Sequence, residues 1–277
     1  MLVQSAYGKS SVRLVQVRRH GDRHDLRDLT VAIQFKGHYD EAYTEGDNKA
    51  VLPTDTMKNT VYALAAREPV SDPERFGLAL AERFLDRNAR LVRARIDLTE
   101  HLWRRIPRGE KEHDHAFIRT GPETRTATVQ SHRRRTIVGA GIADLLVLKS
   151  ADSAFDNFMH DEYTTLPDTR DRILATSLTA TWRYRDLDVD FTPAWNGVRR
   201  VLLEVFAEHQ SESVQHTLHA MGQAVLDSVD VVTAIRLVMP NKHHLPFDLS
   251  RLGLPNRNEI FVPTDEPYGL IEATLTR

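Results

Sequence analysis

Two polar residues at the start of a predicted helix, Thr54 and Asp55, provide the first chemically informative signal in the sequence. They follow Pro53, and apolar residues with helical spacing continue to about Arg67. A hydroxyl or carboxylate here can cap the helix by accepting a backbone N–H of the first turn. That turn also carries the positive end of the helix dipole, which favours a bound anion. The stretch therefore predicts a helix cap, with anion binding as a second use.

Histidine pairs are the candidate metal ligands. His113 and His115 would lie on one face of a strand, whereas His243 and His244 would point to opposite faces. Neither pair comes with a third ligand at a recognisable spacing, and the chain has no cysteine. The sequence therefore predicts no metal site.

The sequence lacks the motifs of common cofactor sites. No Gly-x-Gly-x-x-Gly follows a strand, and there is no P-loop, no Gly-x-Ser-x-Gly and no paired-carboxylate signature. Nucleotide cofactors therefore lose support. What remains is a set of polar clusters at the ends of predicted elements: Tyr7-Gly8-Lys9, Thr54-Asp55, residues 153–155, Asp171-Arg172, Ser213-Val214-Gln215 and Pro240-Asn241-Lys242-His243.

The elements that position these clusters follow an order that is found twice. In the first half, residues 12–18 and 29–36 predict a β-hairpin, and the helix after Pro53 is followed by a second one that begins at Asp72-Pro73. Strands are then predicted at 92–98 and around 116–132. In the second half, strands at 145–148 and 178–184 precede helices from Pro193 and near Ser213, and strands at 231–239 and 260–262 complete the set.

This order predicts two β-β-α-α-β-β modules, residues 1–136 and 137–277. Antiparallel strands with helices on one face make an α+β fold. Because such modules leave free sheet edges, further copies of the chain are expected to close them into an oligomeric barrel.

Composition restricts the partners and the compartment. Of the 277 residues, 41% are hydrophobic, yet no apolar run is long enough to span a bilayer. The formal net charge of -2 gives no general attraction for nucleic acid or anionic membranes. The lack of cysteine fits a reducing compartment, and we see neither a signal-peptide pattern nor a peroxisomal C-terminal tripeptide. We expect a cytoplasmic protein.

Taken in order, the polar clusters resemble the signature blocks of urate oxidase. The blocks extend over nearly the whole chain, at residues 7–9, 46–48, 53–62, 161–166, 171–176, 213–215, 240–243 and 267–272. The resemblance implies a tunnelling fold with two modules per chain, assembled as a homotetramer with active sites at subunit interfaces. It also implies the oxidation of urate by O₂ to 5-hydroxyisourate and hydrogen peroxide, with neither a metal nor an organic cofactor.

The resemblance assigns the substrate contacts residue by residue. Phe155 matches the aromatic platform, Arg172 the cationic fork, and Gln215, beside the backbone of Val214, the amide. These types suit a planar anion because an aromatic face stacks on a ring, a guanidinium offers paired donors, and an amide both donates and accepts. Asn241 would hold O₂ or water above the ring.

The family's proton relay matches Lys9, Thr54 and His243. Removing a second proton makes urate a better one-electron donor, which its reaction with triplet O₂ requires. Lys9 would act as the base through the Thr54 hydroxyl, His243 would move protons through water, and Asp55 would contact the substrate edge. A lysine can be a base near neutral pH when burial or a nearby cation lowers its pKa. Because these residues come from both modules, the resemblance implies a site shared between two chains.

Two other interpretations of the sequence stay open. Another tunnelling-fold enzyme acting on a pterin or purine would share the modules, but such enzymes typically anchor the heterocycle through a glutamate and some use zinc. Gln215 with Arg172 suits urate better. A purine-binding oligomer without catalysis would share the fold, although it would not require Lys9, Thr54 and His243.

Overall fold

The computed structural model describes residues 2–277, and its internal contacts divide the chain into two units. Unit 1 contains the residues up to Gly141 together with Arg183–Thr192, and unit 2 contains Ile142–Trp182 and Pro193–Arg277. These units are defined by contacts and not by repeated architecture. The predicted modules, 1–136 and 137–277, therefore stay a prediction.

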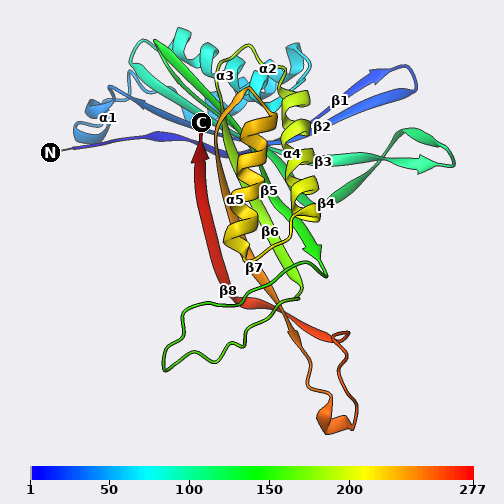
Figure 1. Cartoon of the computed structure of the whole chain (residues 1–277). Coiled ribbons are helices and arrows are strands. Elements are labelled where there is room, and N and C mark those ends of the chain that lie inside the picture. The colour runs from blue at the N-terminus through cyan, green and yellow to red at the C-terminus, as the bar shows by residue number, and fades with distance from the viewer. Residues whose placement is uncertain (1) are drawn as a thin grey trace. The chain divides into compact units, whose positions relative to one another are not determined.

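Unit 1 is built from long antiparallel strands and three helices (Figure 1). Neighbouring strands pair in chain order, and the predicted hairpin, the two long helices and the later strands are confirmed. A short helix after the hairpin was not predicted. The elements are β1 (Tyr7–His20), β2 (Arg23–Gly37), α1 (Asp40–Thr44), α2 (Thr54–Arg67), α3 (Pro73–Arg87), β3 (Leu91–Arg108) and β4 (Lys111–His132).

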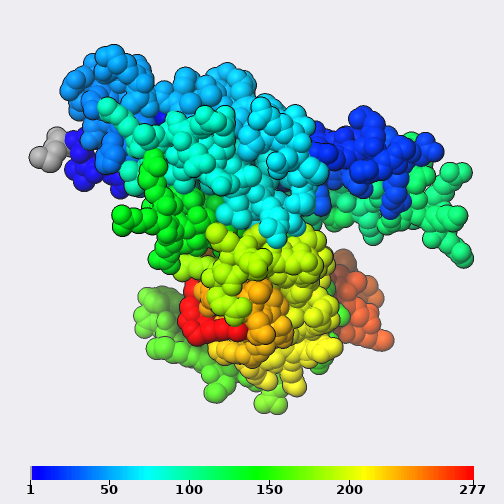
Figure 2. Space-filling model, turned by 90° about the horizontal axis from the view of Figure 1, so that it is seen from above, coloured from blue at the N-terminus to red at the C-terminus, as the bar shows by residue number. Residues whose placement is uncertain are grey.

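The core of unit 1 lies between the strands and the helices α2 and α3. Alternation along the strands buries one face, so that Val31, Ile33 and Phe35 of β2 are at most 3% exposed. Met57 of α2 and Leu80 of α3 are fully buried against this face. Each such side chain contributes about 1.5–3 kcal/mol by leaving water. Seen from above, residues of α2 and α3 form the surface of this part of the chain (Figure 2).

Unit 2 continues the pattern with two helices and further strands. β5 (Arg135–Lys149) and β6 (Leu174–Tyr184) each begin in one unit and end in the other. They are followed by α4 (Phe191–Glu208), α5 (Val214–Ser228), β7 (Val232–Pro246), the 3-10 turn η1 (Ser250–Leu252) and β8 (Phe261–Thr276). α5 packs on β7 and β8. No helix among residues 2–277 is both long and apolar enough to cross a membrane.

β8 is much longer than the strand predicted at 260–262. It pairs antiparallel with β7 up to Thr276, although it contains Pro263, Pro267 and Gly269. These residues are unfavourable in a central strand but are tolerated where only one neighbour must be bonded. β8 is the last strand in the sheet order, and this position explains why local sequence signals underestimate its length.

A buried ion pair connects α3 to β4 in unit 1. Arg125 donates to Oε2 of Glu74 at 2.7 Å, and the side chains are only 4% and 0% exposed. Arg125 also donates to the Thr192 hydroxyl at 3.0 Å. Burial, the largest influence, raises the pKa of Glu74 above its ordinary value, although Arg125 lowers it. Removing either partner would leave the other without its main counter-charge.

We predict that Glu74→Ala lowers the free energy of unfolding by about 3–5 kcal/mol, because it removes the nearer of the two carboxylates that face the buried Arg125 guanidinium and leaves only Asp72, at 3.7 Å. Urea unfolding, followed by tryptophan fluorescence, measures this change. Glu82→Ala is the matched control, since Glu82 is an exposed glutamate of the same helix and its removal should change the value by at most about 0.5 kcal/mol. Equal unfolding midpoints for both variants would contradict the importance of the pair.

Candidate functional site

A cavity of about 260 Å³ in unit 2 brings together four residues that the sequence singled out. Phe155, Arg172, Asn241 and His243 all line it, and its apolar wall includes Leu166, Ile173 and Phe261. An aromatic ring, a guanidinium, an amide and an imidazole thus face one space. Such a set can bind a planar, polar ring and exchange protons with it.

Backbone hydrogen bonds hold Phe155 and Arg172 in a common frame. Phe155 pairs with Thr169 in both directions, with N···O distances of 2.7 and 3.0 Å. The N–H of Arg172 donates to the carbonyl of Ser153 at 2.8 Å. Because residues 153–155 contact both segments through the main chain, the platform and the cationic side chain cannot move independently.

The Arg172 guanidinium lies near the Phe155 ring, with Cζ 5.3 Å from the ring centroid, a geometry that favours cation–π attraction. Burial lowers the pKa of Arg172 from its ordinary value, but a guanidinium keeps its charge at neutral pH. Its Nε is buried without a hydrogen-bond partner among the described residues. This donor is therefore available to an acceptor on a bound ligand.

Phe158 and His160 extend the aromatic platform. The Phe158 ring stacks on Phe155 with centroids 4.8 Å apart and 12° between the ring planes, and His160 stacks on Phe158 at 4.7 Å. Sequence reasoning missed both residues, although two further aromatic rings within five residues of Phe155 were a visible signal. The stack supports the Phe155 ring from its own loop.

Asn241 and His243 come from β7, two residues apart, and both line the cavity. Asn241 is 8% exposed and lies opposite Gly269 of β8, whereas His243 lies opposite Thr264. The register shifts between these two positions. Such irregularities redirect side chains next to binding sites.

Val214 and Gln215 open α5, where Ser213 is the N-cap and its hydroxyl accepts the N–H of His216 at 3.1 Å. Val214 is buried and Gln215 is exposed. Neither is among the described residues that line the cavity. The start of α5 is nonetheless tied to the Phe155 segment, because the carbonyl of Ser211 accepts the N–H of Ala154 at 2.7 Å.

Lys9, Thr54 and Asp55 belong to unit 1, whereas the residues that line the cavity belong to unit 2. Lys9 belongs to β1 and Thr54 is the first residue of α2. The Asp55 carboxylate accepts from Lys58 Nζ at 2.5 Å and from Asn59 Nδ2 at 2.9 Å. Lys58 holds the pKa of Asp55 below its ordinary value, and Lys9 makes a smaller contribution in the same direction.

The predicted cap of α2 is wrong. The N-cap residue is Pro53, and no side chain caps the helix. The first intrahelical bond runs from the Met57 N–H to the Pro53 carbonyl at 3.2 Å, so Thr54 and Asp55 already lie inside the first turn. Asp55 bonds to side chains further along the helix instead. The Thr54 hydroxyl therefore does not cap the helix.

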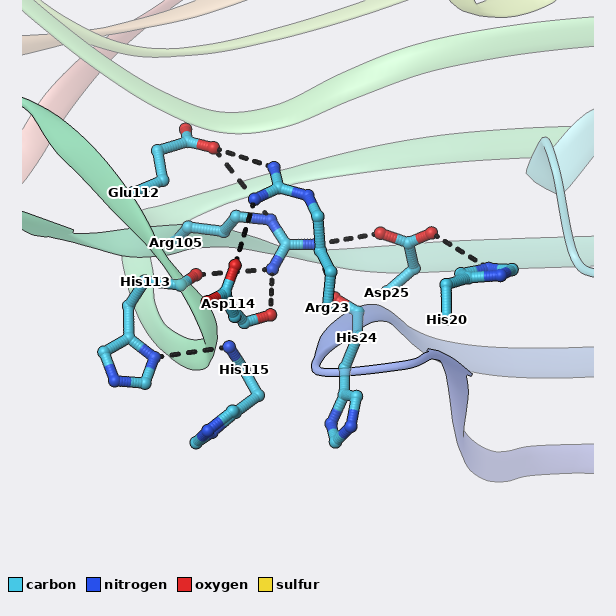
Figure 3. A network of polar contacts seen from close by, with 9 residues as sticks. All are labelled: His20, Arg23, His24, Asp25, Arg105, Glu112, His113, Asp114 and His115. Atoms are coloured by element: carbon cyan, nitrogen blue, oxygen red, sulfur yellow. Dashed lines mark hydrogen bonds and ion pairs between the residues drawn. The ribbon is translucent and has the colours of Figure 1, made fainter.

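Of the two histidine pairs considered as metal ligands, His243 and His244 line the cavity. His113 and His115 belong to a different network, near the ends of the β1–β2 and β3–β4 hairpins (Figure 3). The rings of His113 and His115 pack edge to face, with their centroids 4.7 Å apart. Behind them Arg105 donates to the Asp25 carboxylate at 2.8 Å. Across residues 2–277, no three His, Cys, Asp or Glu side chains are arranged to hold a metal ion.

Comparison with known proteins identifies a family. The family model described as Uricase matches residues 5–130 and 138–272. A uricase from Arthrobacter globiformis is 44% identical over 277 residues, which cover 100% of this chain and 90% of that protein. A uricase from Danio rerio is 35% identical over 281 residues, covering 99% of this chain and 94% of that protein.

A solved structure shares the fold. The crystal structure of uricase from Arthrobacter globiformis superposes with a TM-score of 0.96 at 44% identity, covering 100% of this chain and 95% of that one. The predicted α+β fold with antiparallel strands is therefore confirmed. The oligomeric barrel stays a prediction.

Proposed function

The chain belongs to the uricase family of urate-oxidising enzymes, and we propose that it converts urate, O₂ and water to 5-hydroxyisourate and hydrogen peroxide. In this reaction urate loses two electrons and O₂ gains two with two protons, while the hydroxyl group on the product comes from water. The cavity lined by Phe155, Arg172, Asn241 and His243 is the observation that carries the proposal. No metal or organic cofactor takes part.

Binding is assigned to groups of unit 2. Urate stacks on the Phe155 ring while Arg172 donates to its anionic edge, and the buried, unpartnered Nε of Arg172 supports this role. Gln215 pairs with the polar edge beside the Val214 backbone. The support for Gln215 is indirect: the start of α5 is bonded to the segment that carries Phe155. Asn241, almost fully buried in the cavity wall, holds O₂ or the attacking water above the ring.

Proton transfer is assigned to Lys9, Thr54 and His243. Lys9 takes a proton from urate through the Thr54 hydroxyl, which converts the substrate to a more easily oxidised dianion. His243 then moves protons between water and the intermediate. Lys9 lies in β1 and Thr54 in α2, and the packing of α2 on β1 supports this pairing. Asp55 adds a contact to the substrate edge.

Two copies of the chain share each site in this proposal. The relay residues Lys9 and Thr54 belong to unit 1, and the binding residues belong to unit 2. One copy supplies the relay and a second copy supplies the platform, within a homotetramer that closes the free sheet edges into a barrel. A dissociated monomer is then inactive.

The reaction is tested by following the loss of the ultraviolet absorbance of urate together with oxygen uptake, with and without a metal chelator. We expect oxygen consumption that the chelator does not change, with one hydrogen peroxide formed per O₂. Absence of oxygen uptake would overturn the proposal and would favour a purine-binding oligomer. Inhibition by the chelator would instead point to a metal-dependent enzyme of the same fold.

For the relay, Lys9→Met and Thr54→Ala should each lower kcat by about 10²- to 10⁴-fold, because positioned proton transfer contributes that much. A non-oxidisable purine analogue should still bind. Thr54→Ser should keep much of the activity, since it retains the hydroxyl. Thr56→Ala, an exposed threonine of the same turn, is the control and should remain active. Full activity of both Lys9→Met and Thr54→Ala would remove the relay from the mechanism.

For binding, Arg172→Ala should weaken the affinity for a purine analogue about tenfold to a hundredfold, because it removes charged hydrogen bonds of about 1.5–3 kcal/mol. Isothermal titration measures this loss. Arg170→Ala is the matched control, since Arg170 lies two residues away with its side chain 91% exposed. A fall in kcat with unchanged analogue affinity would contradict the role of Arg172 as an anion clamp.

A further inference from the structure

We propose that Tyr7 is a positioning residue for Thr54, because its phenol ties the loop that carries Thr54 to the strand that carries Lys9. The inference rests on the proposed relay between these two residues. It adds a side chain that contacts neither the substrate nor the transferred proton. Tyr7 acts through the geometry of the loop.

The connection is a single hydrogen bond between β1 and the loop before α2. The phenol oxygen of Tyr7 accepts the backbone N–H of Leu52 at 3.1 Å. Tyr7 precedes Lys9 by two residues, and Leu52 precedes Thr54 by two residues. Because Pro53 has no N–H, Leu52 offers the last backbone donor before the helix. The bond therefore joins two chain segments at positions only two residues from Lys9 and from Thr54.

Other bonds of this loop are local. The N–H of Asp47 donates to the Glu41 carbonyl at 3.1 Å, and the N–H of Val51 donates to the Asn48 carbonyl at 3.0 Å. Both stay within residues 41–51 and shape the loop without joining it to β1. The bond between the Leu52 N–H and the Tyr7 phenol joins the loop to β1.

The phenol itself is held firmly. Its ring packs edge-on against Phe35 and Tyr39, with centroid distances of 5.8 and 5.0 Å, and both neighbours are buried. Burial raises the pKa of Tyr7, although the bond from Leu52 lowers it, so the phenol remains neutral near pH 7. At the next residue β1 pairs with β2 and approaches it closely, since a Cβ on Gly8 would lie 1.9 Å from the carbonyl oxygen of Ile33. β1 is therefore a rigid reference for the loop.

A merely structural role for Tyr7 can be separated from positioning by removing the hydroxyl alone. Tyr7→Phe keeps the ring packing and deletes the acceptor of the Leu52 N–H. Tyr43→Phe is the matched control, because the Tyr43 hydroxyl donates to the Ala6 carbonyl at 3.3 Å and has no bond to the loop. Both variants lose one phenol oxygen from the same region.

The full-length protein is tested by urate kinetics and by amide hydrogen exchange. We expect Tyr7→Phe to accelerate exchange of the Leu52 amide and to lower kcat about tenfold to a hundredfold, with KM for urate largely unchanged. Tyr43→Phe should alter neither. In a Thr54→Ala background, Tyr7→Phe should cause no further loss, because the hydroxyl that it positions is already absent.

Three results would overturn the inference. Unchanged exchange of the Leu52 amide in Tyr7→Phe would show that the bond does not hold the loop. Accelerated exchange with unchanged kcat would show that loop position does not matter. A full additional loss in the Thr54→Ala background would assign Tyr7 another route of action. Failure of the proposed function would be seen separately, because the wild-type protein would then consume no oxygen with urate. That result would remove the relay role of Tyr7, whereas amide exchange of Leu52 would still show whether the hydrogen bond holds the loop.

Discussion

A short backbone ladder at residues 152–155 is the constraint on which the cavity depends. Its main-chain groups bond to Thr169 and Arg172, which precede β6 in the sequence, and to Ser211, which follows β6. Each of these bonds contributes only about 1 kcal/mol net, but together they force three irregular segments into one frame. The main-chain bonds fix the backbone positions from which the Phe155 ring and the Arg172 guanidinium project toward the cavity.

The two groups of site residues are anchored in different ways. Of the residues proposed to bind the substrate, Phe155 and Arg172 are held by the backbone ladder and Asn241 lies on the strand β7. The proposed relay residues of unit 1 lie on β1 and at the start of α2, and the Tyr7 phenol bonds the loop before α2 to β1. Proton transfer tolerates little displacement, because donor and acceptor must come within hydrogen-bond reach. A buried aromatic cluster is a suitable support, since its rings resist rearrangement.

Much of the fold could be predicted because local signals agreed with the tertiary structure. Pro73 at the first helical position marked the start of α3, and the helix predicted near Ser213 is α5, for which the structure shows Ser213 as the N-cap. Alternation identified β2. Two predictions failed where local and tertiary preferences differ: Thr54 does not cap α2, because Pro53 occupies the N-cap position, and β8 continues past its prolines, because one paired neighbour is enough.

The sequence by itself determined the types of element, the polar clusters at their ends and, through the order of those clusters, the family. It also identified Phe155, Arg172, Asn241 and His243 as candidates. Only the tertiary structure decided that these four line one cavity, that Val214 and Gln215 lie outside its lining, and that the Tyr7 phenol bonds to Leu52. The reason is that periodicity reports on neighbours within a few residues, whereas these contacts join segments far apart in the chain, and only the closed backbone brings them together.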